Sequence, residues 1–421
     1  MKVIFDISSV GDNPETRTGI ARTAWSLADL LHQNLGDDLS FSATGSVAAS
    51  LQTQRLLEAH PNLCSAIHPI SNIAKNVDRL HQQVSSDRSN SCSQAIRKTQ
   101  QSILLNISRF INITRQPIDS QILAQADVFH SSYPRIPNQV RKALPNRHLQ
   151  TVYDLTPLLL AEKYFAPGQR GITQRLIDTI QPNDWVTTIS DATRNDLLNR
   201  KRLNPERVAT IYLAASPELF YPVSDKSVIQ ATKQKYQLPE GDYFLSLHSL
   251  APHKNMEHLI SCFRQVILQE KKQDLHLVIC GGNQGAVGSM IKDNQLTDTD
   301  LKFIHFAGFI DDSDLAAIYS GALGFIFPSL YEGFGLPVLE AMQCGCPVIS
   351  SNTSSLPEVV GKAGFLVSPT DKDTLCEYIV KLDRSNELRS EYSQHSLDRS
   401  ALFSWKKTAA ATLKIYERMM S

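Results

Sequence analysis

Short apolar runs alternate with helical patterns along most of the chain. The first run, 2–7, enters a loop containing Gly, Asp, Asn and Pro that ends at Gly19, and a helical pattern then occupies 20–33. Further strands are predicted at 127–130, 148–153, 184–189 and 207–213. Alternation of this kind predicts a parallel sheet covered by helices on both faces.

The same alternation restarts after a charged, proline-containing segment at 216–240, which we interpret as a linker. The second series predicts strands at 243–247, 275–280, 302–307, 324–327 and 347–350, and helices at 255–269, 312–320 and 337–343. The predicted fold class is therefore α/β, with two Rossmann-like doubly wound domains, 1–216 and 217–404, facing a central cleft. Ligands of such sheets bind at the carboxyl ends of the strands.

Composition narrows the class of protein. A chain of 421 residues, 42% hydrophobic and 20% charged, is long and apolar enough for two globular domains. The 42 basic residues balance the 42 acidic ones, so no overall field attracts nucleic acid, and none is expected as a partner.

Cysteine usage and the N-terminus bear on location. The seven cysteines are scattered, and Cys344 and Cys346 are too close for a CxxC pair or a zinc knuckle, which predicts reduced thiols. The chain turns polar at Asp6, too early for a signal peptide, and no apolar run is long enough to span a bilayer. A cytoplasmic protein is expected.

A polar segment at 85–116 has two interpretations. Its second half, 103–113, carries helically spaced apolar residues with Arg109 and Arg115 nearby. It is either an insertion packed on the first domain or a helix on the inner face of the cytoplasmic membrane. The second interpretation would make the membrane surface a partner of this protein.

The most informative stretch follows the strand at 324–327. Glu332 precedes Gly333, Phe334 and Gly335, and a helix then begins that contains Glu340. Glycines flanking an aromatic residue let the backbone approach a ligand, and the helix start offers free amides to a diphosphate or a sugar hydroxyl. Each glutamate alone is equally ordinary as a loop or helix-start acid.

A second candidate cluster, LHSLAPHKN at 247–255, follows the first strand of the second domain. Lys254 stands just before Asn255, a suitable helix cap, so its ammonium group can lie with the helix start beside a diphosphate. A lone lysine in this position is otherwise an ordinary solvated side chain.

The stretch 325–358 closely resembles the signature of the family 4 retaining glycosyltransferases (group 1), in which two glutamates separated by seven residues read the donor. The resemblance spans nearly the whole chain and is weakest at 51–116. It implies the GT-B fold, with an acceptor-binding first domain and a nucleotide-sugar-binding second domain. It also implies that the segment 405–421 is a helix crossing back to the first domain.

By this resemblance Glu332 contacts hydroxyls of the donor sugar, and Glu340 accepts hydrogen bonds from the ribose. The amides from Gly333 through Phe334 and Gly335 to Leu336 lie along sugar and phosphate. Many relatives carry a basic residue followed by Lys-Asn at the position of Lys254. Relatives also place arginine where this chain has Ser249 or His253, so phosphate binding is expected to depend on Lys254 and backbone amides.

Other donor contacts are weaker expectations. Gly281 opens a Gly-Gly turn that suits a close approach to the donor, although a simple tight turn explains it almost as well. Phe309 and Ile310 resemble the segment beside the nucleobase, with core packing as the alternative. Gly19 resembles the glycine loop that faces the donor phosphates from the first domain.

Acceptor contacts are expected in the first domain. Tyr153 and Asp154 resemble a turn in which many relatives have His-Asp-Leu, with tyrosine here in place of histidine. Asp154 would orient an acceptor hydroxyl or simply cap a strand end. His130 and Tyr133, after another strand, are further candidates.

The resemblance implies a retaining hexosyltransferase that needs neither a metal ion nor a cofactor. Its partners would be a nucleotide-sugar donor, favouring GDP-mannose from the pattern at 252–255, and a glycan or lipid-linked acceptor of surface polysaccharide synthesis, such as lipopolysaccharide or capsule. Lys254 would stabilise the leaving diphosphate and Glu332 would orient the sugar. The alternatives are a UDP- or dTDP-sugar transferase, a nucleotide-sugar epimerase of the same architecture, and a non-catalytic nucleotide-sugar-binding module.

Overall fold

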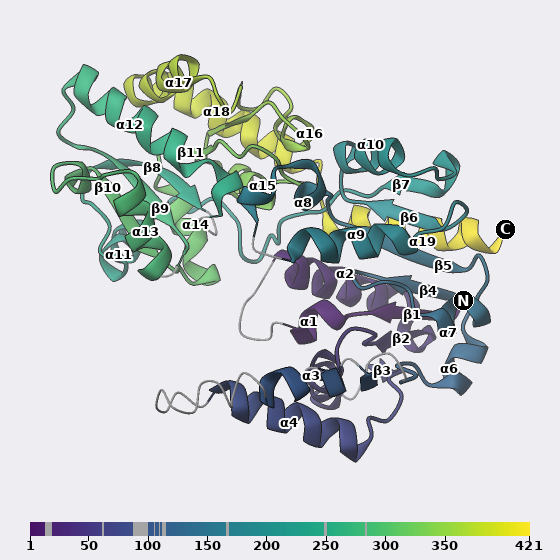
Figure 1. Ribbon diagram of the computed structural model, residues 1–421. Helices are drawn as coiled ribbons and strands as arrows, with labels where there is room; N and C mark the ends of the chain where they lie inside the picture. The colour runs from purple at the N-terminus through teal and green to yellow at the C-terminus, as the bar shows by residue number, and fades with distance from the viewer. Residues whose placement is uncertain are drawn as a thin grey trace.

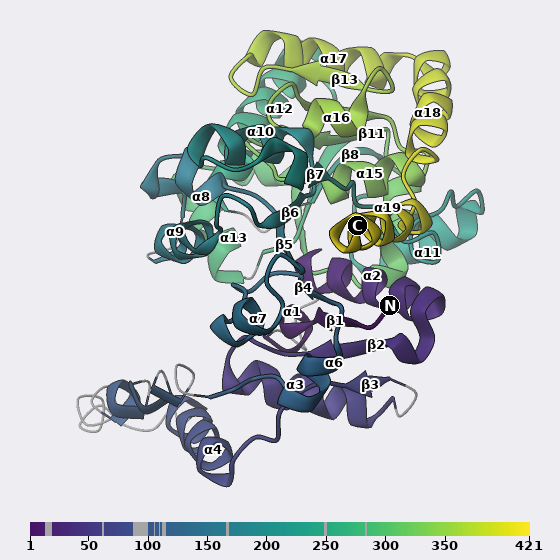
Figure 2. The same cartoon turned by 90° about the vertical axis from the view of Figure 1, so that its right-hand side faces the viewer.

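The computed structural model describes residues 1–12, 19–60, 63–86, 100–104, 106–108, 110–111, 115–165, 168–247, 251–282 and 284–421. Two all-parallel sheets, of seven and six strands, lie next to each other with helices packed around them (Figures 1 and 2). The predicted class, α/β with two Rossmann-like doubly wound domains, is confirmed.

The first sheet has the strand order β3-β2-β1-β4-β5-β6-β7. Its strands are β1 Val3–Asp6, β2 Leu39–Ser42, β3 Cys64–Ser65, β4 Val128–Ser131, β5 His148–Val152, β6 Trp185–Thr188 and β7 Val208–Thr210. The helices around it are α1 Ser8–Asp12, α2 Gly19–Leu35, α3 Val47–Glu58, α4 Asn72–Ser86, α6 Ser120–Gln125, α7 Asn138–Ala143, α8 Thr156–Leu159, α9 Gln169–Thr179 and α10 Asp191–Arg200.

The second sheet has the order β10-β9-β8-β11-β12-β13. Its strands are β8 Asp242–Leu247, β9 Leu275–Cys280, β10 Ile304–Gly308, β11 Gly324–Phe327, β12 Val348–Ser351 and β13 Phe365–Val367. Its helices are α11 Lys226–Lys235, α12 Met256–Glu270, α13 Gln284–Asp293, α14 Asp312–Ser320, α15 Leu336–Gln343, α16 Leu356–Val360, α17 Lys372–Arg384 and α18 Asn386–Ser400. A final helix, α19 Trp405–Met420, follows.

Burial on both faces explains why the central strands read as continuous apolar runs. Every residue of β1 and of β11 is buried, as expected for strands covered by helices on both sides. The strand predicted at 207–213 is shorter, at 208–210, because the chain leaves the sheet toward the second domain. Strands β2, β3 and β13 were not predicted because each is short or, like Leu39–Ser42, half serine.

Two segments connect the domains side by side. The chain leaves the first sheet after β7, and it returns to the first domain between α18 and α19. The two connections lie close together, because the hydroxyl of Thr408, in the first turn of α19, donates to the carbonyl of Tyr212, just after β7, at 2.7 Å. Helix α19, yellow in Figure 1, packs along α2, and Ile415, Tyr416 and Met419 join the apolar core of the first sheet. The last helix is therefore part of the first domain's core.

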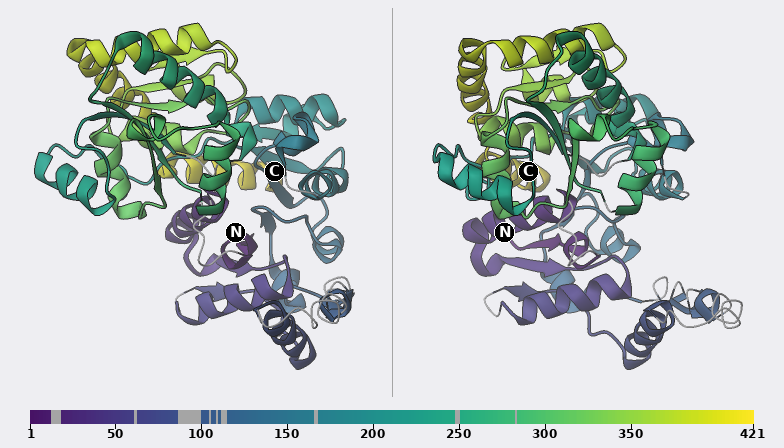
Figure 3. Two further views of the ribbon diagram at one scale, coloured as in Figure 1. Left: turned by 60° about the vertical axis from the view of Figure 1, so that its left-hand side comes forward. Right: turned by 90° about the vertical axis from the view of Figure 1, so that its left-hand side faces the viewer.

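The predicted helix at 103–113 lies partly outside the described residues, but 100–104, 106–108 and 110–111 are helical. Ile103 and Phe110 are exposed there. Helix α4, just before it in the chain, projects away from the first sheet (Figures 1 and 3). None of the helices that the structure describes is long and apolar enough to cross a bilayer.

We predict that Tyr416→Phe destabilises the first domain. The Tyr416 hydroxyl lies 2.7 Å from Nδ1 of the buried His130 ring, and burial lowers the pKa of His130 to about 3, so the ring is neutral. Removing the hydroxyl leaves a buried polar atom without its partner, at a cost of about 1–3 kcal/mol. Urea unfolding should show this loss, whereas Tyr221→Phe, at a tyrosine that is 48% exposed, should change stability little. Equal effects of the two variants would contradict this role.

Candidate active site

Lys254 and Glu332 form an ion pair at the edge of the second sheet. Glu332 follows β11, and Lys254 ends a short 3₁₀ turn, Pro252–Lys254, after β8. Since β8 and β11 are neighbours in the sheet, their carboxyl ends bring the two side chains together. The Lys254 ammonium lies 2.7 and 3.0 Å from the two carboxylate oxygens, and both side chains are largely buried.

Asn255 holds this lysine turn in place, although not as the predicted cap. It occupies the N-cap position of α12, but its side chain makes no capping bond there. Its amide instead donates to the carbonyls of Pro328 and Pro369, at 3.0 and 2.7 Å. The turn carrying Lys254 is therefore tied to the end of β11.

The first domain meets this ion pair through Asp154. Burial raises the pKa of Asp154, Glu332 raises it further, and Lys254 together with a hydrogen bond from the Thr156 amide at 2.9 Å lowers it. Asp154 and the Thr156 amide of the first domain therefore form one electrostatic cluster with Lys254 and Glu332 of the second domain. A cavity of about 490 Å³ adjoins them.

Gly333 permits a close backbone contact between the two domains. A β-carbon at this position would lie 2.7 Å from the Tyr153 carbonyl oxygen and 2.8 Å from the Asp154 β-carbon. The hydroxyl of Thr193, in α10, lies 3.3 and 3.4 Å from the carbonyls of Tyr153 and Gly333. Glycine is required at position 333 because the backbone of the first domain lies too close for a side chain, whether or not a ligand also binds there.

His253 contributes no positive charge beside Lys254. Burial and the Lys254 charge lower the pKa of His253, so the ring is neutral near pH 7. It stacks on Phe165 of the first domain, with ring centres 5.3 Å apart. Ser249 lies outside the described residues.

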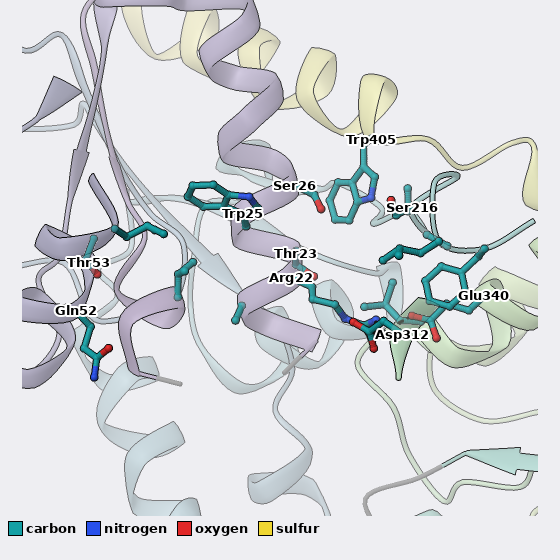
Figure 4. A pocket seen from close by; sticks show the side chains of 18 of the residues that line it. Arg22, Thr23, Trp25, Ser26, Gln52, Thr53, Ser216, Asp312, Glu340 and Trp405 are labelled. Carbon is teal, nitrogen blue, oxygen red and sulfur yellow. Dashed lines mark hydrogen bonds and ion pairs between the residues drawn. The ribbon is translucent and has the colours of Figure 1, made fainter. Parts of the chain in front are cut away.

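Glu340 lies inside α15 and is only 3% exposed. Its Oε1 accepts a hydrogen bond from Arg22 of the first domain at 3.2 Å (Figure 4), and the Tyr319 hydroxyl donates to its Oε2 at 3.4 Å. Gly335 begins this helix with a φ of 109°, a conformation that favours glycine. The other domain approaches here too, because a β-carbon on Gly19 would lie 3.6 Å from the Leu336 side chain.

The remaining donor candidates divide between surface and core. The Gly281 amide donates to the Gly308 carbonyl at 2.6 Å, and its φ of 98° is one that glycine adopts easily. Phe309 is 73% exposed, whereas Ile310 and Phe334 are buried in the core. For Ile310 the structure therefore favours core packing over a contact with a base.

Two acceptor-side candidates lie in the interior instead of the cleft. His130 is 1% exposed, and its second ring nitrogen lies 2.7 Å from the Thr151 hydroxyl, so both nitrogens are engaged within the protein. Tyr153 is buried, and its ring contacts that of Tyr133, which is 37% exposed. Of the four predicted acceptor-side residues, Asp154 is the one that interacts electrostatically with Lys254 and Glu332.

Several cleft residues carried no signal in the sequence. Arg22 contacts Glu340, Phe165 stacks on His253, and the Tyr331 hydroxyl donates to the Asp196 carboxylate. The Glu358 carboxylate also accepts two amide hydrogen bonds, each of 2.7 Å, at the start of α10. Each contact pairs residues of different domains, which periodicity along one chain segment does not reveal.

We predict that Gly333→Ala forces the domains apart. The new methyl group would meet backbone of the first domain, and relieving such overpacking costs about 1–3 kcal/mol. Small-angle scattering should show a larger radius of gyration, and thermal unfolding a lower Tm. Gly288→Ala is the matched control, because a β-carbon in that helix meets nothing within 4 Å and should stabilise slightly. An unchanged radius in Gly333→Ala would contradict the expected separation.

Comparison with known proteins shows which family the second domain resembles. Residues 228–398 match the family described as Glycosyl transferases group 1. The chain is 28% identical over 290 residues to the O-antigen chain mannosyltransferase B of Escherichia coli, a match that covers 69% of this chain and 74% of that protein. It is 31% identical over 281 residues to the serotype-specific mannosyltransferase WbdA of Escherichia coli, covering 66% of this chain and 34% of that longer protein.

Solved structures agree on the fold. The Anabaena protein Alr3699/HepE, crystallised with UDP and glucose, superposes with a TM-score of 0.62 at 16% identity, over 98% of both chains. Sucrose-phosphate synthase from Thermosynechococcus elongatus superposes with a TM-score of 0.66 at 18% identity, over 100% of this chain and 99% of that one. Residues 228–398 therefore resemble the group 1 glycosyltransferases, and the chain as a whole has the GT-B fold of these solved structures.

Proposed function

We propose that the protein transfers mannose from GDP-mannose to a glycan or lipid-linked acceptor in the synthesis of a surface polysaccharide. The observation that carries the proposal is the Lys254–Glu332 ion pair facing Asp154 across the cleft. The mannosyl donor is supported by the similarity to the O-antigen mannosyltransferases. The reaction would occur in the cytoplasm, at the inner face of the membrane when the acceptor is lipid-linked.

The ion pair supports a role for each group in this reaction. Lys254 would neutralise the leaving diphosphate, while Glu332 would accept hydrogen bonds from sugar hydroxyls and hold the ring in place. Because His253 is neutral, Lys254 and the amides at the start of α15 supply the positive potential. We propose on this basis that the reaction needs no metal ion or cofactor.

The proposed transfer proceeds with retention. The bond between the anomeric carbon and the phosphate oxygen breaks while the acceptor oxygen bonds to the same face of that carbon. The acceptor proton passes to the departing phosphate oxygen, and no covalent enzyme intermediate forms. Asp154, which reaches the cluster from the first domain, would orient the acceptor hydroxyl.

We predict that Lys254→Ala lowers kcat by a factor of about 10²–10³, as the loss of one preorganised charge-stabilising donor does in other enzymes. Transfer of labelled mannose from GDP-mannose measures this loss. Lys381→Ala, which removes a surface lysine that pairs with Glu377 in the same helix, is the control and should retain its rate. An unchanged rate in Lys254→Ala would reject its role at the leaving group.

We predict that GDP stabilises the folded protein more than UDP, dTDP or ADP does. A ligand at 100 times its Kd raises the unfolding free energy by about 2.7 kcal/mol, and Glu340→Ala should remove the shift. Stronger stabilisation by another nucleotide would contradict GDP-mannose as the donor but would still support a glycosyltransferase. Donor conversion without acceptor would indicate an epimerase, and nucleotide binding without any conversion would indicate a binding module.

A further inference from the structure

Arg22 and Glu340 are joined across the cleft although they belong to different domains. Arg22 lies in the first turn of α2, and one of its terminal nitrogens lies 3.2 Å from the Glu340 carboxylate. The other lies 3.8 Å from the carboxylate of Asp312, the first residue of α14 (Figure 4). One cation of the first domain therefore contacts two acids of the second.

The surroundings of Glu340 oppose its negative charge. Burial raises its pKa and Asp312 raises it further, while Arg22 and the Tyr319 hydrogen bond lower it. Cys344 lies behind it as a neutral thiol, because burial and the Glu340 charge raise the Cys344 pKa to about 12. Among the charged groups that act on Glu340 in the described part of the chain, Arg22 is the one that favours the ionised acid.

Space for a ligand adjoins this ion pair. A cavity of about 670 Å³ is bordered by Arg22, Asp312 and Glu340. A carboxylate has about four acceptor positions, of which Arg22 and Tyr319 take two. Two hydroxyls of a ligand can therefore bind Glu340 while Arg22 stays in place.

We propose that Arg22 is a positioning residue for the donor nucleotide: from the first domain, it holds the Glu340 carboxylate charged and oriented for the two ribose hydroxyls. This inference rests on the proposed function together with the expectation, from the family resemblance, that Glu340 binds the ribose. It adds that the ribose site is completed by the other domain. Donor affinity therefore depends on the domains being in the arrangement that brings Arg22 to Glu340.

The test is calorimetric titration of Arg22→Gln with GDP and with 2′,3′-dideoxy-GDP, which lacks both ribose hydroxyls. Losing support for hydrogen bonds to a charged group should raise the Kd of GDP about tenfold. The Kd of the dideoxy nucleotide should stay at its wild-type value. Arg22→Lys should recover part of the affinity. Arg147→Gln, which removes an arginine that pairs with Asp127 and does not line this cavity, should bind GDP like wild type.

Two further arms separate positioning from a structural effect. In a Glu340→Gln background, Arg22→Gln should have no additional effect on GDP binding. In Arg22→Gln alone, the Glu340 pKa is raised further, so the acid is protonated at a higher pH. GDP affinity should therefore begin to fall at a higher pH than in wild type as the pH is lowered.

Three outcomes would overturn the inference. Arg22→Gln could bind GDP as tightly as wild type, it could weaken both nucleotides equally, or its effect could persist in the Glu340→Gln background. Failure of the proposed function itself is seen earlier and separately, because the wild-type protein would then bind none of GDP, UDP, dTDP or ADP.

Discussion

The backbone carbonyl of Tyr153 and the α-carbon of Gly333 meet across the cleft with no room for a methyl group between them. The rest of the site depends on this contact. It brings Asp154 to the Lys254–Glu332 pair, and the same arrangement of the domains lets Arg22 reach Glu340. Thr193 and Glu358 support it, because each bonds across the boundary beside it. The active site thus belongs to the pair of domains and not to either one.

The arrangement places each of two positive charges beside acids. Lys254 lies among Glu332, Asp154 and a neutral His253, and Arg22 lies between Glu340 and Asp312. Each cation is already neutralised by an acid within the protein. In the proposed reaction a diphosphate would share Lys254 with Glu332, so phosphate binding would be linked to the position of the residue proposed to hold the sugar.

Features that depend on neighbouring residues in the chain, or on the ends of neighbouring strands, could be predicted from the sequence, whereas other contacts between distant residues could not. The fold was predictable because strands buried on both faces leave continuous apolar runs, as in β1 and β11. The proximity of Lys254 and Glu332 was predictable because both follow strands of one sheet. The role of His130 was not, because its partner Tyr416 lies 286 residues away. Arg22 was missed for the same reason, since its partner is in the other domain.

The docking of α19 has a consequence for how the protein is made. Ile415, Tyr416 and Met419 complete a core that begins with Val3 and Phe5. A ribosome releases the N-terminal strands long before these last side chains exist, whereas the second domain's own core is fully synthesised earlier. The first domain therefore cannot complete its core until α19 has been synthesised, and until then part of its apolar surface is uncovered.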